Sequence, residues 1–226
     1  MSAVTLLQKA PFFAPLNAPE REALAQRLVK RTFAKGMIIF HKGSPGRSLY
    51  IIESGKVRIF LLSSAGQEVS VNVYGPGEVF GELSVLDGLP RSAGAMVLET
   101  TVAYTLYRDD LLQCIQAYPS LANSIIRSLS SRLRYTTRCI EDLAFLDVSG
   151  RVAAKLLELS DRYGQQGNVV EIDLRLTQTD LATWVGARRE SVNKVLSNLR
   201  EQGLIDVDGQ KITILDLPAL EHWIRY

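Results

Sequence analysis

The stretch from Pro119 to Leu146 constrains the fold most, because it reads as one uninterrupted helix. Proline is tolerated in the first turn of a helix, where its missing N–H has no helical partner, and no helix breaker follows before Gly150. Apolar residues recur in this stretch at Ile125, Leu129, Leu133, Ile140 and Leu143. So narrow a stripe is typical of a coiled-coil seam, and an ordinary amphipathic surface helix is the alternative.

Two threonines interrupt the apolar stripe. Thr136 and Thr137 lie between Leu133 and Ile140, where a seam would carry another apolar residue. Their hydroxyl groups add little to apolar packing, so we expect them to serve another purpose. The sequence therefore predicts a dimerisation helix that also joins two domains.

The chain before this helix is rich in β-type patterns, and the chain after it is mainly helical. Between residues 31 and 107 short β-rich runs alternate with glycine turns, and 69–73 has the period of two of a strand with one buried face. The dipeptides Ser54-Gly55 and Ala65-Gly66 are typical of hairpin turns. Six or more such strands predict a β-sandwich, barrel or roll, and the segment from Gly150 onward forms a second unit.

Composition and cysteine usage exclude several classes of protein. The net charge of +2 over 226 residues is too small to indicate a nucleic-acid binder by bulk charge alone. No apolar run approaches the ~20 residues that span a bilayer, and the first residues lack the features of a signal peptide, so we expect a cytoplasmic protein. Cys114 and Cys139 are isolated from each other and from histidine, which gives no support to a metal site.

A helix-turn-helix pattern lies in the second unit. Thr177 is a favourable N-cap with Asp180 at the third helical position, and Gly186 can end that helix in a sharp turn. A second helix is expected over 188–202, with its polar side chains in the N-terminal half that enters the major groove. A basic helix face that is only solvated is the alternative. The expected DNA-contacting residues are Thr177, Gln178, Arg188, Arg189, Glu190, Ser191, Asn193 and Lys194.

The densest polar chemistry in the β-rich region lies between Gly81 and Ala93. A short helix that begins at Gly81-Glu82 would offer free backbone N–H groups to an anion, and Arg91 and Ser92 would bind a phosphate. Glu82 cannot bind a phosphate but is well suited to accept a hydrogen bond from a ribose hydroxyl. Together these residues predict a sugar-phosphate site; the alternative is a turn with a Glu82–Arg91 salt bridge.

Three segments together resemble the cyclic-AMP receptor protein (CRP/FNR) family of bacterial transcription regulators. They are 80–93, 132–153 and 185–196, and they follow one another in the family's order and spacing. The resemblance implies an α+β fold with a β-roll (double-stranded jelly-roll) cyclic-nucleotide-binding domain over 1–118. A central dimerisation helix over 119–148 and a winged helix-turn-helix over 149–226 would follow.

The resemblance also implies the ligand and the partners. Cyclic AMP is the expected effector, with the Thr136–Thr137 pair on its adenine, one threonine from each subunit of a homodimer. Residues at matching positions are Gly81, Glu82, Leu83, Arg91, Ser92, Thr136 and Thr137. Arg189, Glu190 and Lys194 match the base-reading positions, so a TGTGA-like near-palindrome is the expected operator, and RNA polymerase is a further expected partner. At the third position lysine replaces the usual arginine.

The sequence argues against enzymes and against some relatives within the family. It contains no Ser/His/Asp or Cys/His set and no P-loop lysine. Oxygen-sensing relatives need an N-terminal cysteine cluster, and haem-binding relatives need axial ligands, whereas His41 has no evident partner. Two alternatives stay open: a family member that responds to another nucleotide or to no ligand, and a nucleotide-binding module that regulates a protein partner.

Overall fold

The computed structural model describes residues 1–64, 66, 68–165, 169–172, 177–209 and 211–224. The chain forms two compact units, Met1–Leu133 and Arg134–Tyr226. Their boundary falls inside the long helix α5 (Pro119–Phe145), which ends one residue earlier than expected. The expected single helix is therefore confirmed, while the three-part division at 118 and 148 stays a prediction.

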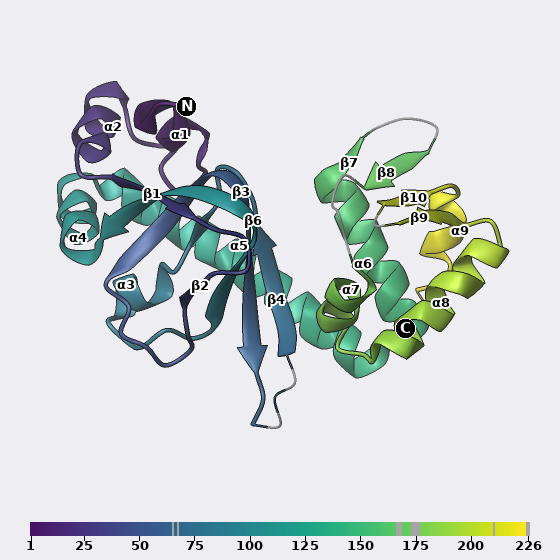
Figure 1. The fold of residues 1–226 in the computed structure, drawn as a ribbon. Helices are drawn as coiled ribbons and strands as arrows, with labels where there is room; N and C mark the ends of the chain where they lie inside the picture. Colours follow the sequence, from purple (N-terminus) through teal and green to yellow (C-terminus); the bar gives the residue numbers. More distant parts are fainter. Residues whose placement is uncertain (65, 67, 166–168, 173–176, 210, 225–226) are drawn as a thin grey trace. The chain divides into compact units, whose positions relative to one another are not determined.

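The first unit contains an antiparallel β-roll built on two long strands, β3 (Ser48–Leu62) and β6 (Gly94–Tyr107). Both β1 and β2 pair with β6, and both β4 and β5 pair with β3, so each long strand has different partners along its length. The four shorter strands are β1 (Val29–Phe33), β2 (Ile38–Phe40), β4 (Glu68–Tyr74) and β5 (Val79–Phe80). This arrangement confirms the expected β-rich domain, which Figure 1 shows with its strand labels.

Strand β3 does not turn at Ser54-Gly55, so the expected hairpin there is wrong; Ala65 of the other expected hairpin dipeptide lies outside the described residues. Its pairing with β6 continues on both sides of the dipeptide, with register shifts around Ser54 and Lys56. Gly55 has a φ of +89°, and a Cβ added there would lie 2.5 Å from the backbone oxygen of Thr100. The glycine therefore allows an irregularity within a continuing strand, because it tolerates a positive φ and a close backbone neighbour.

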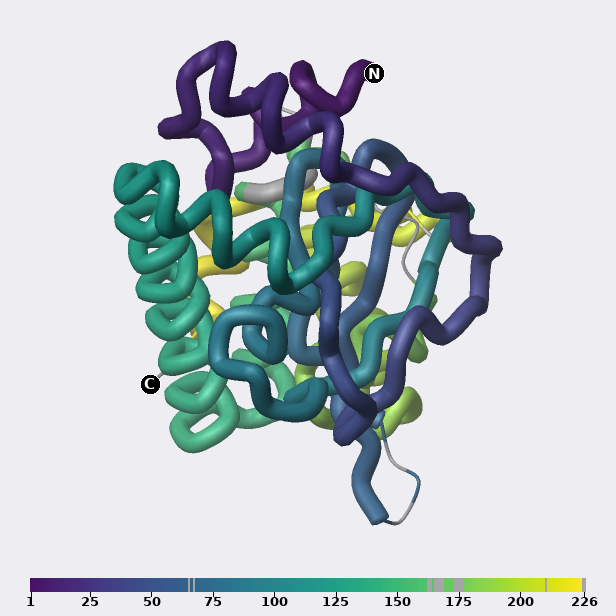
Figure 2. The backbone as a smooth tube through the Cα atoms, turned by 90° about the vertical axis from the view of Figure 1, so that its left-hand side faces the viewer, coloured from purple at the N-terminus to yellow at the C-terminus, as the bar shows by residue number. Residues whose placement is uncertain are grey.

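Helices close one end of the β-roll. The helices α1 (Ala3–Lys9), α2 (Ala18–Ala25) and α4 (Arg108–Ala117) belong to the first unit, and Figure 2 shows the two N-terminal ones together at one end of the roll. Their apolar side chains share a buried core with β3, β6 and the start of α5, for example through Phe13, Leu106 and Leu121. This core fixes which face of α5 is buried in the first unit.

The exposed apolar stripe of α5 differs from the expected one at its start. Ile125 is only 4% exposed and belongs to the core of the first unit, so its assignment to the seam is wrong. Its neighbour Ile126 is 60% exposed instead, and the stripe continues through Leu133 and Ile140, which are 69% and 62% exposed. With Leu129, Thr136 and Leu143 these residues alternate at spacings of three and four, which is the heptad pattern of a coiled coil.

The second unit is a small α+β domain. Its helices are α6 (Val148–Tyr163), α7 (Gln178–Val185), α8 (Arg189–Glu201) and α9 (Leu217–Glu221). Its sheet has the order β7-β8-β10-β9, from β7 (Gly164–Gln165), β8 (Val170–Ile172), β9 (Ile205–Asp208) and β10 (Lys211–Ile214). A shared core includes Leu156, Leu181 and Leu199. The pair α7–α8 followed by the β9–β10 hairpin confirms the winged helix-turn-helix (Figure 1).

Candidate functional site

Arg91 lies buried in the β-roll and is held on three sides. Its Nη1 donates hydrogen bonds to the carbonyl oxygen of Gly81 (2.6 Å) and to Ser84 Oγ (3.0 Å), and its Nη2 donates to the carbonyl oxygen of Ser48 (2.7 Å). The guanidinium carbon lies 4.1 Å from the centre of the Phe40 ring. The guanidinium is therefore fixed in position by neutral groups.

The charge of Arg91 is not compensated by an ion pair with any carboxylate in the described part of the chain. Its side chain is 5% exposed, and its Nε is buried without a hydrogen-bond partner. Burial lowers the pKa of this guanidinium, because removal from water disfavours the charged form. A fixed, buried cation with an unused donor is suited to bind an anionic oxygen.

The backbone at Gly81 depends on glycine. Gly81 follows β5 and has a φ of +75°, and a Cβ added there would lie 2.8 Å from Arg91 Nη1. The short helix α3 (Leu83–Asp87) begins just after it, with Glu82 as its N-cap residue. Among the other expected ligand residues, Leu83 and Ser92 are exposed. A side chain at residue 81 would displace the guanidinium that its carbonyl oxygen holds.

Glu82 pairs with Arg132 of α5 rather than with Arg91, so the alternative of a Glu82–Arg91 salt bridge is wrong. Glu82 is buried, and its Oε1 accepts a hydrogen bond from Arg132 Nη1 at 2.6 Å. Arg132 Nη2 donates to the carbonyl oxygen of Val79 at 2.5 Å, and its guanidinium carbon lies 4.7 Å from the centre of the Tyr74 ring. Burial raises the pKa of the Tyr74 phenol.

Sequence analysis did not single out Arg132 as a site residue. Arg132 lies one helical turn before Thr136, and this spacing is the local feature of the sequence that could have indicated that Arg132 lies near the proposed ligand site. The structure thus brings Gly81, Glu82, Arg91 and Arg132 together in the first unit. Thr136 and Thr137 are exposed on the part of α5 that belongs to the second unit.

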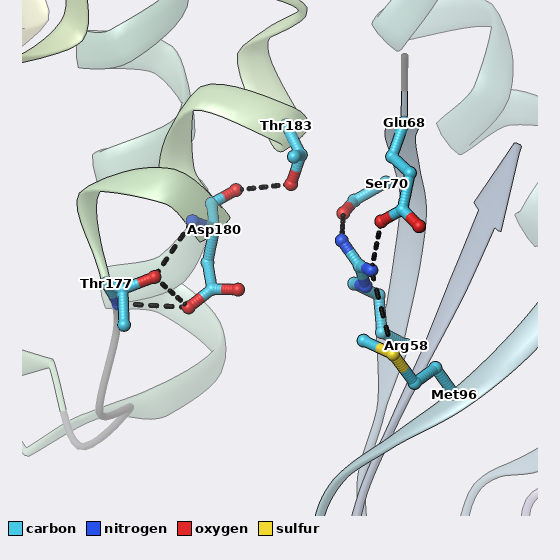
Figure 3. Close-up of polar contacts among 7 residues, drawn as sticks. All are labelled: Arg58, Glu68, Ser70, Met96, Thr177, Asp180 and Thr183. Carbon is cyan, nitrogen blue, oxygen red and sulfur yellow. Dashed lines mark hydrogen bonds and ion pairs between the residues drawn. The ribbon is translucent and has the colours of Figure 1, made fainter. Parts of the chain in front are cut away.

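The turn of the helix-turn-helix has the expected caps. The backbone N–H of Asp180 donates to Thr177 Oγ1 (3.1 Å), and the Thr177 N–H donates to Asp180 Oδ2 (3.0 Å), as Figure 3 shows. Gly186 ends α7 with a φ of +60°, and the Ala187 N–H donates to the carbonyl oxygen of Ala182 (3.0 Å). The capping residues identified from the sequence are therefore confirmed as the start and end of α7.

Arg151 of α6 donates a hydrogen bond to a backbone oxygen next to this turn, and it was not identified from the sequence. Its Nε donates to the carbonyl oxygen of Val185 (2.8 Å), the last residue of α7. Its Nη1 donates to the carbonyl oxygen of Leu146 (2.7 Å), just after the end of α5. A cation near the C-terminal carbonyls of a helix is favourable, so Arg151 fixes the end of α7 against the segment between α5 and α6.

The N-terminal half of α8 presents charged side chains to solvent. Arg189, Glu190 and Lys194 are exposed, as is Arg188, which is the N-cap residue and makes no side-chain capping bond. Of the other residues expected to contact DNA, Thr177 is exposed, while Gln178, Ser191 and Asn193 are half-buried. The Asn193 Oδ1 is buried without a hydrogen-bond partner.

Two further observations bear on the class of protein. Among the described residues no group of three or more His, Cys, Asp or Glu side chains could hold a metal ion. None of the helices in the described ranges combines the length and apolar character that a bilayer span requires.

Comparisons with known proteins identify two matched domains and close relatives. Residues 30–118 match the cyclic nucleotide-binding domain, and residues 150–223 match the Crp-like helix-turn-helix domain. The chain is 38% identical to a CRP-like cAMP-activated global transcriptional regulator of Mycobacterium tuberculosis, with 97% of this chain and 99% of that protein covered. It is 34% identical to the cyclic AMP receptor protein of Thermus thermophilus, with 95% and 97% covered.

A solved structure is similar over most of the chain. The c-di-GMP-responsive global regulator CLP of Xanthomonas campestris has a TM-score of 0.77 at 27% identity, with 88% of this chain and 99% of that chain covered. The sequence relatives are therefore transcription regulators, as is this structural neighbour.

Proposed function

We propose, from the premise that the chain belongs to the CRP/FNR family of transcription regulators, that cyclic AMP is the effector that controls its binding to DNA. One observation carries the assignment of a phosphate-containing effector: the buried, unpaired charge of Arg91 beside the Gly81–Glu82 turn. A cyclic phosphate would supply the missing negative charge and an acceptor for the guanidinium. The names of two relatives, cAMP-activated and cyclic AMP receptor, support the same ligand.

The proposed contacts divide the nucleotide into three parts. Arg91, Ser92 and the backbone from Gly81 to Leu83 would bind the cyclic phosphate. Glu82, which Arg132 already orients, would accept the hydrogen bond of the ribose 2′-OH. Thr136 and Thr137 would contact the adenine, one from each subunit.

The apolar stripe of α5 supports a homodimer. Ile126, Leu133 and Ile140 are exposed at heptad spacing, and such side chains are stabilised when a second helix covers them. A two-fold dimer would bind a near-palindromic, TGTGA-like operator with half-sites about one helical turn, roughly 34 Å, apart. Arg189, Glu190 and Lys194 would read base edges. The remaining polar residues around the turn would contact DNA phosphates and so fix the register of the protein on the duplex. RNA polymerase is the proposed partner through which bound regulator acts on transcription.

The proposed mechanism is a shift of population. Cyclic AMP would favour the arrangement of the dimer in which both recognition helices fit the operator, because its contacts differ between the two arrangements. Thr136 and Thr137 would couple the adenine to the helix pair. The expected consequence is a higher affinity for the operator when the nucleotide is present.

Cyclic di-GMP is the second candidate effector. The structural neighbour from Xanthomonas campestris is c-di-GMP-responsive and 27% identical to this chain. Two phosphates would also satisfy a buried arginine, so the charge of Arg91 by itself does not discriminate. The names of the two sequence relatives, which are more similar to this chain, favour cyclic AMP.

Calorimetric titration with cyclic AMP, cyclic GMP and cyclic di-GMP tests the effector. We expect saturable heat with cyclic AMP at micromolar concentration and weaker binding of the other two. The absence of heat with cyclic AMP at high micromolar concentration would refute the ligand assignment. A gel-shift titration of a TGTGA palindrome with and without cyclic AMP then tests the allosteric part, which is wrong if the two curves coincide.

A further inference from the structure

In the second unit, side chains from α5, α6 and α7 converge on Lys155. The Nζ of Lys155 lies 2.7 Å from Glu158 Oε2 and donates a hydrogen bond to the Tyr135 hydroxyl at 3.0 Å. The same ammonium lies 5.6 Å from the centre of the Tyr135 ring and 5.3 Å from that of the Trp184 ring. One cation thus contacts three helices: Tyr135 is on α5, Glu158 on α6 and Trp184 on α7.

The position of Lys155 is unusual for a lysine on a helix. Its side chain is only 14% exposed, whereas lysine is almost never fully buried unless it is paired. The Glu158 carboxylate, the Tyr135 hydroxyl oxygen and the Trp184 ring compensate the charge that is withdrawn from water. These contacts depend on geometry, because the hydrogen bond to Tyr135 requires a short distance between Nζ and the hydroxyl, and the cation–π contact with Trp184 requires the ammonium within about 6 Å of the ring centre.

The side chains around Lys155 are half-buried and carry polar groups, as Tyr135, Cys139 and Trp184 show. The Tyr135 hydroxyl also donates to Glu158 Oε2 at 3.4 Å, and burial raises the pKa of the neighbouring Cys139 thiol. The Trp184 Nε1 is buried without a hydrogen-bond partner. The lysine is therefore held by a specific set of neighbours in a confined space.

The placement of these neighbours links two parts of the proposed mechanism. Tyr135 immediately precedes Thr136 and Thr137, the proposed adenine contacts. Trp184 immediately precedes Val185, whose carbonyl oxygen Arg151 holds at the end of α7. A rotation or shift of α5 at the threonines would therefore move the Tyr135 side of the cluster relative to Trp184.

We propose that Lys155 is a positioning residue that couples α5 to the first helix of the helix-turn-helix. This inference rests on the proposed function. The energy of the Lys155 contacts depends on the position of Tyr135. If nucleotide binding shifts or rotates α5, Tyr135 moves, and the position of α7 in which Lys155 best contacts both Tyr135 and Trp184 moves with it. Lys155 touches neither DNA nor nucleotide in this scheme, and its effect is on the coupling between them.

The test compares Lys155→Met with Lys35→Met in the full-length protein. Methionine keeps the length of the side chain but removes its charge and its hydrogen bonds; Lys35, exposed in the first unit, is a charge-matched control. The readout is the ratio of operator dissociation constants without and with cyclic AMP, from which a general loss of charge or stability cancels. We expect Lys155→Met to reduce this ratio by about fivefold or more, within the usual range of coupling factors, and Lys35→Met to leave it unchanged. A ratio for Lys155→Met within twofold of wild type overturns the proposal.

Two further variants identify the contacts that matter. Lys155→Arg keeps a cation that stacks on aromatic rings and is expected to retain most of the ratio. In a double-mutant cycle, Tyr135→Phe is expected to reduce the ratio of operator dissociation constants in the wild-type background but to have little further effect in a Lys155→Met background. Both substitutions remove the same hydrogen bond. Full additivity of the two would contradict a shared contact.

A failure of the ligand assignment gives a different result. If the wild type shows no response to cyclic AMP, the proposed effector is wrong, and Lys155 is then judged by operator affinity without nucleotide. The proposal still requires Lys155→Met to change that affinity by more than Lys35→Met does. Equal affinities of the two variants overturn it.

Discussion

Two buried arginines in the β-roll differ in what compensates their charge. Arg58 and Arg91 are each 5% exposed. Arg58 Nη2 lies 2.5 Å from Glu68 Oε2 and its Nη1 donates to Ser70 Oγ at 3.4 Å (Figure 3), whereas Arg91 is held by carbonyl oxygens and a hydroxyl. The ion pair with Glu68, whose side chain is 37% exposed, makes Arg58 a structural residue, and the lack of such a partner makes Arg91 the candidate for an anionic ligand.

This contrast gives a prediction with a matched control. Arg91→Met is expected to abolish measurable cyclic-AMP binding, because it removes the cation and its fork of donors. Arg58→Met is expected to lower the free energy of unfolding by about 1.5–3 kcal/mol, because it removes the charged hydrogen bond to the solvent-exposed Glu68, and to preserve nucleotide binding. Calorimetric titration and denaturant unfolding of both variants measure the two effects. Equal losses of nucleotide binding would show that burial, and not the missing carboxylate, distinguishes the site.

Two elements, α7 and α8, each end at a left-handed glycine, but only one of these glycines is crowded. Gly186 after α7 has a φ of +60°, and an added Cβ would lie 3.3 Å from Leu143 Cδ2. Gly203 after α8 has a φ of +71°, and no atom lies within 4 Å of its added Cβ. The first turn therefore has a steric constraint that the second lacks.

Alanine at the two glycines is expected to have different effects on DNA binding. Each substitution should destabilise the protein by about 1–2 kcal/mol through the left-handed backbone. Gly186→Ala should in addition reduce operator affinity, because Leu143 must move and α8 follows this turn directly. Thermal unfolding and gel-shift titration give the two quantities. Operator affinities that fall equally in both variants would contradict a special role of the first turn.

The helix α5 is the element on which the proposed dimer depends. Leu133→Ser and Ile140→Ser should weaken dimerisation, because each removes an apolar side chain worth about 1.5–3 kcal/mol of burial, twice in a symmetric dimer. Sedimentation velocity over a range of concentrations measures the change. Leu89→Ser is the control, since Leu89 is 63% exposed on a loop of the β-roll. A dimer as stable in the α5 variants as in the control would refute the seam.

At the scale of the whole molecule, effector and DNA must influence each other equally. If cyclic AMP raises operator affinity by some factor, a saturating operator must raise cyclic-AMP affinity by the same factor. Titration of the nucleotide into free protein and into the protein–operator complex measures this factor. Unequal factors would indicate a further linked equilibrium, such as dimerisation, and contradict the two-arrangement mechanism.

Salt dependence separates the two kinds of binding in the same molecule. Operator affinity should fall steeply with salt, because contacts with phosphates release counterions from DNA. Cyclic-AMP affinity should change far less between 50 and 200 mM salt, since Arg91 is buried and screened little by ions. Parallel titrations at the two salt concentrations measure both slopes. A nucleotide affinity as salt-sensitive as operator affinity would point to a surface site instead.

The sequence by itself determined the features that depend on neighbours a few residues apart. The caps Thr177 and Gly186, the long helix from Pro119 and the β-rich texture before it all follow from local preferences, and the structure confirms them. The resemblance of three separate segments added the order of the domains. Such features can be predicted because a helix cap or a strand alternation is set by local backbone geometry.

Only the tertiary structure decided what depends on contacts between distant residues. It buried Ile125 and exposed Ile126, because the core of the first unit selects one face of α5. It continued β3 across Gly55, because β6 supplies hydrogen bonds on both sides. It joined Arg132 to Glu82 and gathered three helices around Lys155, since these pairs are close only after the chain has folded.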